Sequence, residues 1–134
     1  MSDVDLYILK FCPEIQQRLM AIRQTARKVF RGLDEKLYHG LPAFSANGKV
    51  IMFYGAYKSH ISICVGDDWV DFLKTQYPQF RYTQFTIQFQ HGEPFCEEVV
   101  QVICELLNQG QRGKTVTERQ ALEPGRGSVR KRLF

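Results

Sequence analysis

Three histidines and four cysteines are the side chains in this 134-residue sequence that could ligate a transition metal. They are His39, His60, His91, Cys12, Cys64, Cys96 and Cys104. Zinc sites usually take ligands from pairs that are close in sequence, and no Cys-x-x-Cys pair occurs here. His60 and Cys64 would lie about 13 Å apart along one strand. Cys96 and Cys104 would lie about 12 Å apart along one helix, too far for a disulfide. The spacing favours reduced, structural cysteines in a cytoplasmic protein over a zinc site.

The sequence offers little that would support catalysis. It contains no Gly-x-Ser-x-Gly nucleophile elbow, no glycine-rich phosphate loop and no His-Glu-x-x-His helix. Each cysteine could in principle pair with a histidine, but a thiol packed in the core is the simpler interpretation. We therefore expect a protein that is not an enzyme.

Charge separates the chain into two parts. The whole sequence carries 18 basic and 14 acidic residues, a net charge of +4. Residues 111–134 hold seven of the basic and two of the acidic groups, so this segment carries +5 and residues 1–110 carry −1. We expect one folded domain over residues 1–110 and a basic, flexible tail over 111–134. The start lacks the pattern of a secretory signal, and no apolar run is long enough to span a membrane.

Apolar residues spaced three and four apart predict long helices over residues 13–30 and 94–108. A shorter helix is expected to begin at Gly66-Asp67-Asp68. Its expected inner residues are Trp69, Phe72 and Leu73. The first long helix also carries Arg18, Arg23 and Arg27 opposite its apolar stripe. We therefore expect that helix to present a basic surface.

Between residues 34 and 65, and again over 83–89, the hydrophobic period falls to two, which is typical of strands. Asn47-Gly48 between two apolar runs predicts a hairpin. Strand alternation places His60 and Ser62 on the face opposite Ile61 and Ile63. The sequence thus predicts an α+β fold, with a single antiparallel sheet covered on one face by N- and C-terminal helices.

Two segments resemble the YdhG-like domain family, some of whose members are described as frataxin-like intracellular iron chaperones. They are residues 38–44 (Tyr-His-Gly-Leu-Pro-Ala-Phe) and 56–61 (Ala-Tyr-Lys-Ser-His-Ile), in the family's order and spacing. A third match, residues 86–89, departs from the family pattern, which usually has Gly and Pro where Phe85 and Gln90 stand here. The likeness covers about residues 5–109. It implies helices packed on one antiparallel sheet, and it implies no catalysis.

The matching segments mark six residues as a candidate ligand pocket: Tyr38, Pro42, Phe44, Tyr57, Lys58 and His60. Their aromatic rings could form the walls, with the lysine and histidine binding a small anionic molecule. In particular, Tyr38, Phe44, Lys58 and His60 are expected to line one concave site, where Lys58 would lower the pKa of His60. The alternative is purely structural: the proline sets a turn, the aromatic rings pack the sheet, and the two basic residues end a strand.

Carboxylates offer a second kind of metal site. The resemblance to a family with iron-chaperone members makes this site worth considering. Asp67, Asp68 and Asp71 cluster around one short helix, and Glu97, Glu98 and Glu105 line the last one. Hard oxygen ligands suit iron, although acids in a first helical turn also complement the helix dipole. The expected basic surface of the first helix argues against an iron donor.

Two functions therefore stay open. The first is a non-enzymatic binding module of the YdhG-like kind, either an intracellular iron chaperone or a small-ligand binder. The second is an interaction protein whose basic C-terminal tail contacts a partner or nucleic acid. Either could act as a monomer or as a homodimer.

Overall fold

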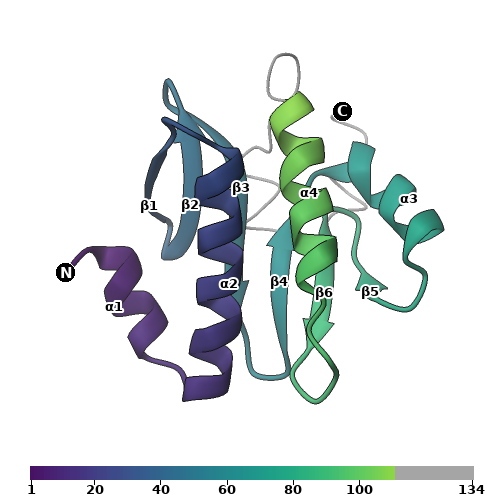
Figure 1. Ribbon diagram of the computed structural model, residues 1–134, viewed down its shortest axis with the longest axis horizontal. Coiled ribbons are helices and arrows are strands. Elements are labelled where there is room, and N and C mark those ends of the chain that lie inside the picture. The colour runs from purple at the N-terminus through teal and green to yellow at the C-terminus, as the bar shows by residue number, and fades with distance from the viewer. Residues whose placement is uncertain (111–134) are drawn as a thin grey trace.

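The computed structural model describes residues 1–110, and the predicted basic tail lies outside them. Helices and strands follow one another in the order shown in Figure 1. Their bounds are α1 Asp3–Leu9, α2 Pro13–Val29, β1 Asp34–Tyr38, β2 Leu41–Ala46, β3 Lys49–Ala56, β4 His60–Cys64, α3 Asp67–Gln76, β5 Arg81–Tyr82, β6 Thr86–Gln90 and α4 Glu97–Gly110. None of these helices is both long and apolar enough to cross a membrane.

The strands form one antiparallel sheet in the order β1-β2-β3-β4-β6-β5. The first four strands form the predicted meander, and β6 pairs directly with β4. Asn47 and Gly48, with φ values of 53° and 80°, make the tight turn between β2 and β3. The predicted α+β class with a single antiparallel sheet is confirmed.

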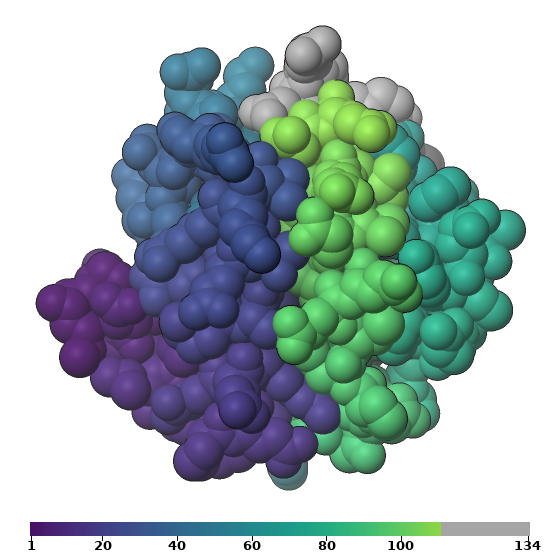
Figure 2. Space-filling view, in the orientation of Figure 1, coloured from purple at the N-terminus to yellow at the C-terminus, as the bar shows by residue number. Residues whose placement is uncertain are grey.

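Helices α2 and α4 lie side by side across one face of the sheet (Figure 1). Figure 2 shows this helical layer from outside, and the side chains of α2 and α4 touch where the two helices meet. The core lies between the helices and the sheet and includes Leu19, Ile22, Ile63, Ile87 and Ile103, all fully buried. The two long helices predicted from the sequence are therefore the ones that bury the sheet.

The short elements were harder to foresee. Helix α1 was not predicted, although Ser2 and Asp5 form a capping box at its start. In α3 the buried residues are Val70 and Leu73. The prediction of an inward Phe72 is wrong, because its side chain lies on another side of that helix and is 43% exposed.

The expected basic surface on α2 is only partly present, because Arg27 is exposed but the Arg18 and Arg23 side chains are not. The Arg23 side chain is only 5% exposed and pairs with Asp5 at 2.6 Å and with Glu35 at 2.9 Å. The Arg18 guanidinium donates hydrogen bonds to the backbone carbonyl oxygens of Gln90 and Glu93. The hydrogen bond from the Arg23 guanidinium holds the pKa of the Asp5 carboxyl well below its usual range. Arg23 therefore links α2 to α1 and β1 by ion pairs within the fold, and Arg18 links α2 to the end of β6 and the segment after it.

Candidate functional site

The two faces of the sheet differ because side chains alternate along each strand. Phe44 and Tyr54 stack on each other, and the Phe44 ring lies 5.8 Å from that of Phe30, which follows α2. Both therefore face the helices. Phe53, next to Tyr54, points to the opposite face. Strand register places Phe53 opposite Cys64. The face away from α2 and α4 is therefore the one that could bind something from outside.

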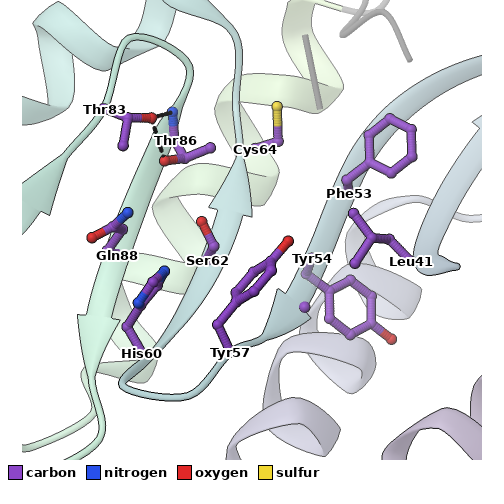
Figure 3. Close-up of a pocket in the computed structure, with 11 residues that line it drawn as sticks. Leu41, Phe53, Tyr54, Tyr57, His60, Ser62, Cys64, Thr83, Thr86 and Gln88 are labelled. Atoms are coloured by element: carbon purple, nitrogen blue, oxygen red, sulfur yellow. Dashed lines mark hydrogen bonds between the residues drawn. The ribbon is translucent and has the colours of Figure 1, made fainter. Parts of the chain in front are cut away.

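Two rows of residues cross this face. Phe53, Cys64 and Thr86 are partners across β3, β4 and β6. Gly55, Ser62 and Gln88 form the second row over the same strands. Because glycine has no side chain, the second row is shallow at its β3 end. A hollow of about 320 Å³ lies over these rows (Figure 3). This volume is within the range of small-molecule sites.

The polar groups of the hollow fall into two kinds. The Thr83 and Thr86 hydroxyls lie 2.6 Å apart, and Thr83 Oγ1 accepts from the Thr86 backbone N–H at 3.2 Å (Figure 3). These two side chains are therefore satisfied within the fold. Ser62 and Gln88 are half-buried, and their side chains form no hydrogen bond within the described residues. Their hydroxyl and amide groups are free to bind a ligand.

His60 and Tyr57 lie at one end of the hollow. Their rings stack, with centroids 5.2 Å apart, and Ser59 Oγ is 3.2 Å from His60 Nδ1. The ring of His91 donates from Nε2 to the Tyr57 carbonyl oxygen at 2.7 Å. Burial lowers the pKa of His60, and the nearby His91 lowers it further. The direction expected from the sequence is confirmed, but the cause is burial and a histidine, and Lys58 is not among the causes.

Cys64 forms part of the wall of the hollow, and its thiol is protonated at neutral pH. Burial raises its pKa to about 12. Cys104, in the helical core, has its pKa raised to about 12 for the same reason. The four cysteines are all free, and Cys12 is exposed.

The structure separates the six residues of the predicted pocket. Tyr57 and His60 line the hollow. Phe44 and Pro42 are buried, and strand alternation turns both toward the helices. Tyr38 lies on the outer strand β1, where its hydroxyl is 3.1 Å from Ser45 Oγ.

Lys58 is exposed in the turn between β3 and β4 and does not line the hollow. The prediction that Tyr38, Phe44, Lys58 and His60 line one concave site is therefore wrong. The physical reason is strand parity, because Phe44 and His60 project from opposite faces of the sheet. Sequence reasoning placed Ser62 beside His60 but did not extend the site to Gln88 or Phe53. The register between strands was the missing information.

Asp67, Asp68 and Asp71 lie along a second, open groove at the start of α3. Lys74 and Gln84 line the same groove. Within residues 1–110, no three histidine, cysteine or acidic side chains are grouped so that they could hold one metal ion. Iron binding by these aspartates stays a prediction.

No protein-family model matches the sequence, and no curated protein matches it detectably. Among the solved structures that are similar to it are two bacterial proteins. One is a protein of the DUF1801 family, YdhG, from Bacillus subtilis, with a TM-score of 0.73 and 13% identity over 84% of this chain and 94% of that chain. The other is an uncharacterized conserved protein from Lactobacillus casei ATCC 334, with a TM-score of 0.54 and 17% identity over 88% of this chain and 100% of that chain.

At these identities the likeness shows the fold alone. The chain has the α+β fold of the YdhG-like DUF1801 protein, as the sequence motifs implied. Neither protein is described as binding iron or as resembling frataxin.

Proposed function

We propose that this protein is a non-enzymatic binding module that takes a small molecule into the hollow on the open face of its sheet. The observation that carries the proposal is the combination of volume and free polar groups. The hollow measures about 320 Å³, and the Ser62 and Gln88 side chains in it have no hydrogen-bond partner among the described residues. A concave, largely apolar site with a few free polar groups is typical of ligand-binding sites.

The same geometry gives little support to catalysis. His60 and Ser62 share a strand face, but His60 Nδ1 lies 3.2 Å from Ser59 Oγ, and among the described residues no hydrogen bond joins the His60 ring to the Ser62 hydroxyl. His60 and Cys64 are about 13 Å apart along the strand, and the Cys64 thiol is protonated at neutral pH. A nucleophile paired with a base is therefore not supported at this site.

Iron carriage, the other form of the binding hypothesis, has less support. Its aspartates share their groove with Lys74, whose charge opposes a bound cation. A ferrous titration of the full chain beside the Asp67→Asn, Asp68→Asn, Asp71→Asn triple variant tests it, since carboxylate ligation requires weaker binding by the variant. The alternative in which the basic tail contacts a partner or nucleic acid concerns residues outside the described part of the chain.

A fragment screen by NMR on the ¹⁵N-labelled full chain tests small-molecule binding. We expect fragments to shift the backbone amides of Ser62 and Gln88. Ser62→Phe, which fills the hollow, should abolish these shifts. Gln24→Phe, on the exposed side of α2, should preserve them. If no fragment binds, or if binding survives Ser62→Phe, the proposal fails.

A further inference from the structure

The hollow has one apolar side and one polar side. Leu41, Phe53 and Gly55, from β2 and β3, form the apolar side (Figure 3). Ser62 and Gln88, on β4 and β6, belong to the polar side. Since the strands run next to one another in a fixed order, the two sides are held at a constant separation. A molecule that fills the hollow would contact both sides at once.

The lining also carries no permanent charge. Among the described residues around the hollow, none is Lys, Arg, Asp or Glu. His60 is the one titratable base there, and its lowered pKa keeps the imidazole neutral at pH 7. A charged group brought into the hollow would lose water without gaining an opposite charge, which is costly. The lining thus disfavours the small anion expected from the sequence.

The free polar groups are of a kind that suits a neutral partner. A serine hydroxyl and a glutamine amide each offer both a donor and an acceptor. A carboxylate can only accept, and an ammonium group can only donate, so each would leave part of this pair unsatisfied. A primary amide or an alcohol can do both, and it complements Ser62 and Gln88.

We propose that the ligand is an uncharged amphipathic molecule, with an aromatic or aliphatic body against Leu41 and Phe53 and an amide or alcohol group bound to Ser62 and Gln88. This inference rests on the proposed function and specifies the ligand class of the same site. It replaces the small anionic molecule expected from the sequence.

Four probes with one common body separate these ideas: 3-phenylpropanamide, 3-phenylpropanoate, 3-phenylpropylammonium and propylbenzene. Each is titrated by NMR into the full chain at pH 7.5. We expect the amide to bind at least about tenfold more tightly than either ion, since an ion would lose water without meeting an opposite charge in the lining and would leave part of the Ser62 and Gln88 pair unsatisfied. We also expect the amide to bind more tightly than propylbenzene, which has the body without the polar group.

Variants then assign the polar contact. Gln88→Glu keeps the size of the side chain and adds a negative charge, so it should reverse the order in favour of the ammonium probe. The matched control Gln24→Glu, on exposed α2, should leave the order unchanged. Ser62→Ala removes a hydroxyl and should weaken the amide several-fold while leaving propylbenzene unchanged.

The outcomes distinguish the two proposals. If either ion binds as tightly as the amide to the unaltered chain, or if the amide binds no better than propylbenzene, the neutral-ligand inference is overturned and the binding site survives. The neutral-ligand inference is also overturned, and the binding site again survives, if Ser62→Ala and Gln88→Glu both leave the order of affinities unchanged. If none of the four probes binds, propylbenzene included, the hollow is not a ligand site and both proposals fail.

Discussion

Tyr57 stacks its ring on the imidazole of His60, with centroids 5.2 Å apart and ring planes 23° apart. The tyrosine belongs to the connection between β3 and β4 and is 44% exposed. Its carbonyl oxygen accepts a hydrogen bond from His91, which follows β6. One end of the hollow is thus defined by two connections that meet beyond the ends of the strands.

The ring of His60 should titrate below its ordinary value of about 6.5. Burial is the larger cause and His91 the second, so His91→Gln should raise the pKa of His60 part of the way back. Lys58→Gln should leave it unchanged. Proton NMR of the His60 ring Hε1 signal, followed through a pH titration, measures this pKa in the unaltered chain and in both variants. A large upward shift in the Lys58 variant would contradict this assignment of causes.

The lowered pKa of His60 also has a consequence for stability. Between the folded-state pKa and about 6.5, the unfolded chain binds more protons than the folded chain. The free energy of unfolding contributed by this group is therefore fully present above pH 6.5 and falls as the pH is lowered through this window. Urea unfolding at pH 7.5 and pH 5.5, with His60→Gln as the control, should show a smaller loss in the variant.

Arg23 should matter far more to stability than Arg27, although both bind Glu35. Arg23 is 5% exposed and Arg27 is 53% exposed, while the Glu35 side chain is 10% exposed. Arg23→Met removes the buried guanidinium that bonds both oxygens of the Glu35 carboxylate and should cost about 3 kcal/mol in the free energy of unfolding. Arg27→Met should cost less than about 1 kcal/mol. Equal losses in urea unfolding would contradict this difference.

Gly55 lies where a side chain has no room. A Cβ at this position would be 2.9 Å from Leu41 Cδ2 and 3.0 Å from Tyr7 Oη. The Tyr7 hydroxyl accepts a hydrogen bond from the Ala56 backbone N–H and cannot move without breaking it. Gly55→Ala should destabilise the protein by about 1–2 kcal/mol. Gly92→Ala is the control, since its Cβ would meet nothing within 4 Å. An equal melting temperature for the two variants would argue against this crowding.

The buried thiols should resist alkylation. Cys64 and Cys104 have pKa values raised to about 12 by burial, so little thiolate is present at pH 8. Iodoacetamide under native conditions should label exposed Cys12 first and these two slowly, although Cys64 lines the hollow. Mass spectrometry follows each site, and all should react in denaturant. Rapid native labelling of Cys64 would mean that its thiol is open to solvent.

Local patterns predicted the large elements well. Apolar spacing predicted α2 to within one residue of its end at Val29, and Asn47-Gly48 identified the β2–β3 turn. Helix α1 was not predicted because its seven residues make only about two helical turns, which is too short for a clear apolar period. Its signals were the capping box at Ser2 and the buried trio Val4, Tyr7 and Ile8.

The site depended on information that is not local. Alternation correctly set His60 and Ser62 opposite the isoleucines. It could not reveal that Ser62 pairs with Gln88, because α3 and β5 intervene in the sequence. Likewise, the burial of Arg23 depends on Asp5 and Glu35, which flank α2 in the chain but meet the arginine only after folding. Long-range register and long-range ion pairs thus account for the failed predictions about the pocket and about the surface of α2.

The crowding around Gly55 also limits how this chain could change over evolutionary time. Tyr7, Leu41 and Gly55 come from α1, β2 and β3, and they share one small volume beside the hollow. A larger residue at position 55 would be tolerated only with a smaller one at position 41 and the loss of the hydroxyl at position 7. In distant descendants of this sequence, the three positions should therefore substitute together. Such covariation would link the first helix, far from the hollow in sequence, to the shape of the ligand that the hollow accepts.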